Sequence, residues 1–128
     1  MRIAKVVVLL VVTMFFSLAQ AGEIKPYSQA DFDKLSAAGK PIVLAIHASW
    51  CPTCKIQKPI QSDLMSSPAY KDVTMFTIDF DSDKPLLKKF KVSMQSTMVG
   101  FKGKKEVSRS VGDTSREGIE TIFKKTVL

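Results

Sequence analysis

Residues 42–54 read Ile-Val-Leu-Ala-Ile-His-Ala-Ser-Trp-Cys-Pro-Thr-Cys. The first five of them form a continuous apolar run, which predicts a strand that is buried on both faces of a sheet. Beyond this run, the spacing of the apolar side chains predicts a helix over residues 52–65. Cys51 and Cys54 are therefore expected where a buried strand leads into a helix.

The segments on either side alternate between helix and strand signals. Ser28 followed by Asp31 resembles a capping box, and it predicts a helix that ends at Gly39. The later elements are strands over 73–80, 97–101 and 106–111, and helices that begin at Asp81 or Ser82 and at Asp113 or Thr114. This order predicts an α/β domain with a mixed sheet and helices on both of its faces.

The start of the chain has the pattern of a secretory signal peptide. A basic start precedes an apolar stretch over residues 6–19, and an Ala-x-Ala cleavage site ends at Ala21. A helix over that stretch would span only about 21 Å, against a hydrocarbon core of roughly 30 Å. We expect a signal peptide over residues 1–21, one domain over residues 22–128, and no stable membrane insertion after cleavage. An uncleaved anchor is the alternative, and both interpretations place the domain outside the cytosol.

The distribution of charge argues against a nucleic-acid site. Without the signal peptide the chain holds 17 basic and 12 acidic residues, a net charge of +5. The excess lies in short lysine groups with acidic residues between them and little aromatic interleaving, which is typical of solvated faces. We expect no nucleic-acid partner, while a weak preference for acidic partners or anionic lipid surfaces stays open.

The chain has only two cysteines, Cys51 and Cys54. A disulfide that closes so short a loop removes little conformational entropy from the unfolded chain, so it would contribute little to stability. Redox chemistry is the better reason for the pair.

Together these features resemble the thioredoxin family over nearly all of residues 23–125. The features that carry the resemblance are the motif Trp50-Cys51-Pro52-Thr53-Cys54 after a buried strand, Pro59, the hairpin with Phe101, and Val111-Gly112 before the last helix. A Cys-x-x-Cys near a βαβ pattern is a general mark of thioredoxin-like redox proteins. The resemblance implies a thioredoxin-like fold, with a central mixed sheet of four to five strands flanked by helices on both faces. It also implies a thiol–disulfide oxidoreductase with no cofactor beyond the redox-active disulfide Cys51–Cys54, and no metal.

The position of the cysteines suggests a role for each. Unpaired N–H groups at a helix start stabilise a thiolate, which makes Cys51 the expected nucleophile. Cys54 lies one turn inside the helix, so we expect it to be less exposed and to cleave the mixed disulfide that Cys51 forms. The expected partners of this monomer are exported protein clients with thiols or disulfides and an unidentified redox partner, in a bacterial periplasm. Reductant, oxidant and isomerase activities all stay open, because potentials vary with the dipeptide and its surroundings.

Two positions depart from the family pattern. The family has a buried aspartate six residues before the nucleophile and a cis-proline in the loop that faces the disulfide, whereas this chain has Ala45 and Ser96. A cis bond before a non-proline residue costs roughly 3 to 4 kcal/mol, so we expect a trans Gln95–Ser96 bond. The Ser96 hydroxyl would then lie near the disulfide and donate to the Cys51 thiolate, which lowers the thiol pKa and favours the reduced state. A Ser96→Pro substitution is expected to reverse this effect.

Other side chains are expected to shape the substrate site. Trp50 would shield the disulfide and offer clients a flat apolar contact, with packing alone as the alternative. The remaining members of this group are Pro52, Thr53 and Thr97.

His47 is the only histidine of the chain. A lone strand histidine is often a packing residue, but its place four residues before Cys51 suits proton transfer near the thiols. The predicted strand order brings Asp81 to a neighbouring strand end on the same side. We therefore predict a hydrogen bond between His47 and Asp81, a pair that would replace the missing buried aspartate.

Two other classes of protein could use the same residues. Cys51, Cys54 and His47 offer at most three soft or imidazole ligands, so a zinc, copper or iron–sulfur protein would need a bridged dimer. Metal analysis of freshly reduced protein tests that class. The other class is a non-catalytic interaction module, which an insulin-reduction assay tests.

Overall fold

The computed structural model describes residues 21–128, and the predicted signal peptide up to residue 20 lies outside the described residues. The elements in chain order are β1 (Glu23–Pro26), α1 (Gln29–Ala37), β2 (Pro41–His47), α2 (Pro52–Met65), the short 3₁₀ helix η1 (Pro68–Tyr70), β3 (Thr74–Asp79), α3 (Lys84–Lys89), β4 (Thr97–Lys102), β5 (Lys105–Val111) and α4 (Arg116–Val127). Within this described part, no helix combines the length and the apolar character that a membrane span needs.

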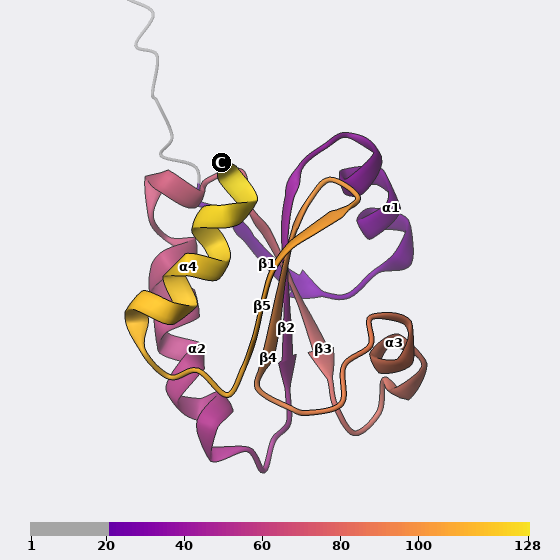
Figure 1. The fold of residues 1–128 in the computed structure, drawn as a ribbon, viewed down its shortest axis with the longest axis vertical. Helices are drawn as coiled ribbons and strands as arrows, with labels where there is room; N and C mark the ends of the chain where they lie inside the picture. Colours follow the sequence, from indigo (N-terminus) through magenta and orange to yellow (C-terminus); the bar gives the residue numbers. More distant parts are fainter. Residues whose placement is uncertain (1–20) are drawn as a thin grey trace, which may run out of the picture.

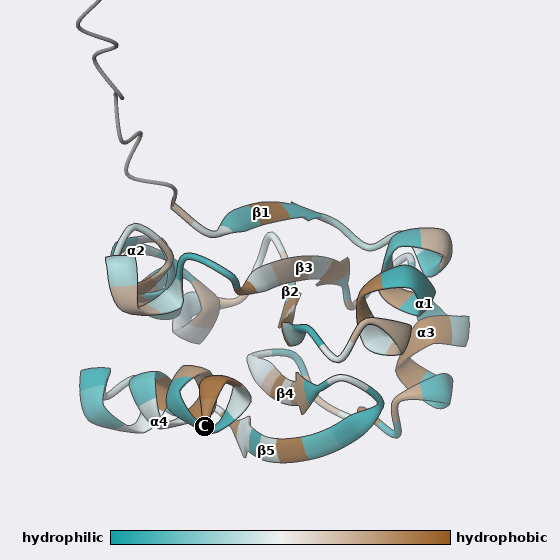
Figure 2. Ribbon diagram, turned by 90° about the horizontal axis from the view of Figure 1, so that it is seen from above, coloured by the Kyte–Doolittle hydropathy of each residue, from teal (hydrophilic) through white to brown (hydrophobic). Residues whose placement is uncertain are grey.

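The strands labelled in Figure 1 form one mixed sheet in the order β1-β3-β2-β4-β5, which Figure 2 shows from one edge of the sheet to the other. β1 and β2 both run parallel to β3, whereas β4 runs antiparallel to β2 and to β5. The central strand β2 is the predicted apolar run, and its residues from Ile42 to Ile46 are all buried. The predicted fold class, a mixed sheet of four to five strands, is confirmed.

Helices cover both faces of the sheet, as Figure 2 shows from above. Alternate residues of β2 point to opposite faces, because side chains in a strand alternate. One face packs against α1 and α3 through a cluster that includes Phe32, Ile42, Leu44, Phe76 and Phe90. The other face packs against α2 and α4 through Val43, Leu64, Met98, Ile119 and Phe123, among others. The start of α2 is thereby fixed at the end of β2.

Most element boundaries agree with the sequence analysis. The predicted cap of α1 is confirmed, since the side chain of Ser28 accepts a hydrogen bond from the Asp31 amide at 3.3 Å. The predicted caps of the last two helices are wrong: Asp83 precedes α3 and Ser115 caps α4. β1 has no counterpart among the predicted elements.

Candidate active site

The two cysteines lie where β2 leads into α2, as predicted. Cys51 is the N-cap residue of α2, and its Sγ accepts a hydrogen bond from the Cys54 amide at 3.1 Å. Pro52, which is exposed, takes the first helical position, where its missing N–H leaves no intrahelical bond unmade. The half-buried Thr53 follows it in the first turn. Cys51 and Cys54 form a disulfide with a Cα–Cα distance of 5.3 Å.

The burial of the two sulfur-bearing residues differs from the prediction. Cys51 has an exposed fraction of 0% and Cys54 one of 8%, so the expectation that Cys54 is the less exposed is wrong for this disulfide form. A tight turn, in which the Cys51 amide donates to the Ala48 carbonyl at 3.2 Å, directs Cys51 inward. Both cysteines pack with Ala48 and with the half-buried Phe80. The place of Cys51 at the start of α2 is still the reason to expect a stabilised thiolate there.

Ser96 contacts both sulfur atoms. Its Oγ lies 3.0 Å from Cys51 Sγ and 3.1 Å from Cys54 Sγ. Disulfide sulfurs carry no proton, so the hydroxyl is the donor in this form. No cis peptide bond occurs in residues 21–128, which confirms the expected trans Gln95–Ser96 bond. The predicted approach of the serine hydroxyl to the disulfide is also confirmed.

The backbone of Ser96 is held in an unusual conformation. Its φ is +60°, in the left-handed region that residues other than glycine rarely adopt. The amide donates to the Ile46 carbonyl at 2.9 Å, and the carbonyl accepts from the Gly112 amide at 3.0 Å. Gln57 Nε2 also donates to the Ser96 carbonyl, at 3.1 Å, and to the Asp113 carbonyl at 2.8 Å. These bonds from separate segments offset the cost of the conformation.

Gln57 is the site residue that the sequence analysis misses. Its exposed fraction is 2%, which is low for a glutamine on a helix. The spacing from Cys54 is three residues, so both lie on the inner face of α2. A polar residue at that spacing from the motif is the signal that could have identified it.

Trp50 lies over the site and is 53% exposed. Its Nε1 donates to Asp81 Oδ2 at 2.8 Å, and its ring meets Phe80 edge-on with centroids 6.5 Å apart. Among the described residues, no hydrogen bond joins Asp81 to His47, so the predicted pair is replaced by Trp50 and Asp81. The cause is the strand register, which places Asp79 beside His47 and leaves Asp81 in the turn beyond β3.

Asp79 is held as a carboxylate by that turn. Its Oδ1 accepts hydrogen bonds from the amides of Asp81 at 2.8 Å and Ser82 at 2.9 Å. The Ser82 amide is the main cause that lowers the pKa of Asp79 below its ordinary value, and the positive charge of the neighbouring His47 contributes in the same direction.

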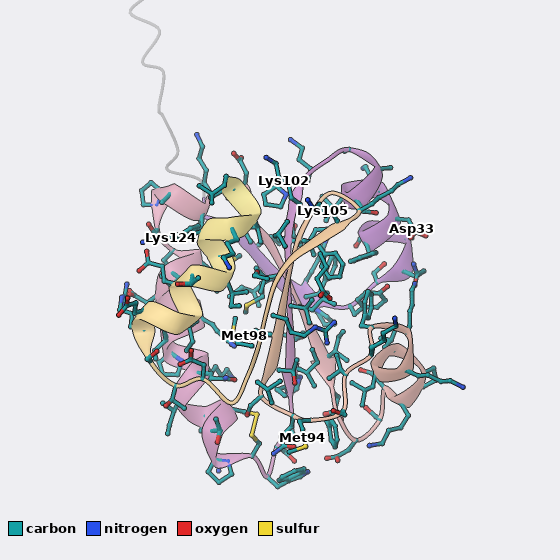
Figure 3. All side chains as sticks on the ribbon, in the orientation of Figure 1. Asp33, Met94, Met98, Lys102, Lys105 and Lys124 are labelled. Carbon is teal, nitrogen blue, oxygen red and sulfur yellow. A yellow bond between two sulfur atoms is a disulfide. The ribbon has the colours of Figure 1, made fainter. Side chains whose placement is uncertain are left out.

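The loop before β4 completes the site. The buried Thr97 donates from Oγ1 to the Met94 carbonyl at 2.7 Å, which closes the loop next to Ser96. Figure 3 shows Met94 at the end of the molecule where α2 begins, opposite the end that carries Lys102, Lys105 and Lys124. Across residues 21–128, no group of three or more His, Cys, Asp or Glu side chains is arranged to hold a metal ion.

The sequence model of the thioredoxin family matches residues 23–125 of this chain. The chain belongs to the thioredoxin family. Thioredoxin-2 of Saccharomyces cerevisiae is 33% identical over 86 residues, which cover 66% of this chain and 81% of the relative. Thioredoxin of Chlamydia trachomatis is 29% identical over 102 residues, 80% of this chain and 97% of the relative. The crystal structure of Trxlp from Edwardsiella tarda is similar with a TM-score of 0.76 and 37% identity, and the match covers 79% of this chain and 98% of that one.

Membership of the thioredoxin family explains the geometry of the site. The chain is a thiol–disulfide oxidoreductase, and the redox-active disulfide Cys51–Cys54 is part of the protein itself, so the activity needs no cofactor. Thioredoxins exchange electrons with thiols and disulfides of other proteins, and protein thiols and disulfides are accordingly the substrates here.

Removing the Ser96 hydroxyl is expected to raise the pKa of the Cys51 thiol in the reduced protein. A hydrogen bond to a charged group contributes about 1.5 to 3 kcal/mol, which corresponds to roughly one to two pKa units. A Ser96→Ala variant should show this rise when thiolate absorbance is titrated, and its couple should become more reducing. Ser93→Ala, an exposed serine in the same loop, is the matched control. Identical titrations for Ser96→Ala and the native protein would contradict the electrostatic role of the hydroxyl.

Proline at position 96 is expected to destabilise the protein. Proline fixes φ near −65°, whereas Ser96 has φ +60°, and proline also lacks the N–H that binds the Ile46 carbonyl. Ser96→Pro therefore does not isolate the hydroxyl, which corrects the expectation from sequence. We expect it to lower the free energy of unfolding by more than about 1 kcal/mol in urea denaturation. Ser96→Gly, which accepts positive φ freely, should unfold near the native midpoint, and a loss as large as that of Ser96→Pro would show that the backbone is not the cause.

Proposed function

We propose that this thioredoxin-family chain exchanges disulfides with exported protein clients, with Cys51 as the attacking thiol and Cys54 as the resolving thiol. The Ser96 hydroxyl lies 3.0 Å from Cys51 Sγ and 3.1 Å from Cys54 Sγ, so it does not distinguish the two thiolates. The observation that carries the assignment is the Cys54 amide, which donates to Cys51 Sγ at 3.1 Å. A donor directed at one sulfur stabilises its thiolate over that of its partner.

The exchange follows from this asymmetry. The Cys51 thiolate attacks one sulfur of a client disulfide, and the other client sulfur leaves as a thiolate. Cys54, as a thiolate, then attacks Cys51 Sγ, which releases the first client sulfur and forms the Cys51–Cys54 disulfide. Two electrons pass to the client in this direction, and the reverse sequence oxidises a client dithiol.

Apolar side chains near the disulfide support a protein client. Trp50 is 53% exposed, Met94 is 48% exposed, and Val111, which is 58% exposed, pairs in register with Thr97 next to Ser96. Exposed aromatic and methionine side chains are enriched where proteins bind one another. In this proposal, a client packs on these three side chains, which form the rim of the site, and moves them enough to reach Cys51.

The cysteine variants test the assignment. We expect Cys51→Ser to abolish insulin reduction, and Cys54→Ser to accumulate mixed disulfides with protein clients, because no thiol then resolves them. Mass spectrometry of the trapped adducts locates the bond. Trapped adducts in Cys51→Ser together with turnover in Cys54→Ser would reverse the two roles.

Export to a bacterial periplasm, as a monomer, is the second part of this proposal. Its support is the pattern of a basic start, an apolar stretch and an Ala-x-Ala site in residues 1–21. We expect that the full chain, when expressed in a bacterium, is recovered from the periplasmic fraction. Its measured mass should be that of a chain that begins at Gly22. An intact mass from the membrane fraction would instead support the uncleaved anchor.

A further inference from the structure

A cavity of about 430 Å³ lies beside Cys54 on the α2 side of the sheet. Residues of β1, β2, β3 and α2 line it. Cys54 is one of these lining residues and Cys51 is not. Cys54 therefore borders a space that Cys51 does not.

Few groups in this cavity can accept a proton. Its titratable lining residues besides Cys54 are His47, Lys55 and Lys58. Lysine side chains are protonated at neutral pH, so they stabilise anions but do not take up protons there. Position 45, which also lines the cavity, is alanine. The imidazole of His47 is thus the lining side chain whose ordinary pKa suits proton transfer near neutral pH.

The surroundings of His47 fit that task. It is the last residue of β2, exposed at the rim of the cavity, and Asp79 stands beside it in the parallel register of β3. The amides of Asp81 and Ser82 hold Asp79 as a carboxylate. From α2, the charges that border the cavity are those of Lys55 and Lys58, and the lining residue of β1, Ile24, is apolar.

We propose that His47 accepts the proton of Cys54 through water in this cavity when Cys54 resolves a mixed disulfide, and returns it when the disulfide is reduced. The inference rests on the proposed roles of the two cysteines. The S–H bond of Cys54 breaks, its proton passes to the imidazole, and the thiolate attacks Cys51 Sγ while the client sulfur leaves with its electron pair. A cavity with polar lining groups and this volume has room for bridging water. Lys58, one helical turn after Cys54, stabilises the transient thiolate.

Stopped-flow reaction of the reduced protein with Ellman's reagent separates the two steps. The first nitrothiobenzoate is released by attack of Cys51, at a rate that depends on reagent concentration. The second is released by Cys54 at a rate that does not. Since general base catalysis contributes about 10² to 10⁴-fold, we expect His47→Gln to slow the second phase at pH 7 by at least about tenfold and to shift its pH profile to higher pH. The first phase should change by less than about twofold, because Cys51 does not border the cavity.

Controls distinguish proton transfer from packing. Thr77→Val changes another lining residue without altering charge, and its second phase should keep the native pH profile. Added imidazole should accelerate the second phase of His47→Ala but not that of the native protein, which a packing role would not produce. A native pH profile in His47→Gln, or no rescue of a slow His47→Ala, would overturn the inference. If the native protein itself lacks a second phase, the proposed role of Cys54 fails instead.

Discussion

The hydrogen bond from the Ser96 amide to the Ile46 carbonyl, 2.9 Å long, holds the site together. It ties the loop before β4 to β2 just ahead of the cysteines, and the Gln57 side chain on α2 binds the same residue through its carbonyl. Three segments far apart in the chain therefore meet at Ser96. The hydroxyl reaches both sulfurs only because the backbone is fixed in this way, and a proline could not donate the bond that fixes it.

The sequence predicted the parts of the fold that local pattern determines. β2 and α2 were predictable because an apolar run and a helical spacing each reflect burial in a single element. β1 was not, because Glu23–Pro26 contains one central apolar residue, Ile24, and becomes a strand only by pairing with the distant β3. The cap of α4 was misplaced for a related reason: Asp113 accepts from the Ser115 amide at 2.8 Å, so its carboxylate serves the turn that leads into the helix.

In the candidate site, too, features set by local sequence were predictable and features set by distant pairing were not. The cysteines were predictable from the position of the motif between a strand and a helix. The place of Ser96 followed from the family resemblance, which puts position 96 in the loop that faces the disulfide. The partner of Asp81 was not predictable, because the β2–β3 register and the length of the following turn decide which side chain it meets. Nor was the burial of Cys51, which depends on the turn from Ala48 and on a loop 45 residues later in the chain.

The burial of Cys51 bears on how such a protein survives chemical damage. Oxidants convert accessible thiolates through sulfenic to sulfinic acid, and the later steps are irreversible. Where the reduced form keeps the packing seen here, with Cys51 at 0% exposure, a small oxidant reaches the sulfur only when the surrounding side chains open. A protein client, in contrast, gains contact area at the rim that offsets the cost of opening it. The reactivity of Cys51 then depends on client binding. If a sulfenic acid forms on Cys51, the adjacent Cys54 can condense with it and restore the disulfide before an irreversible oxidation step.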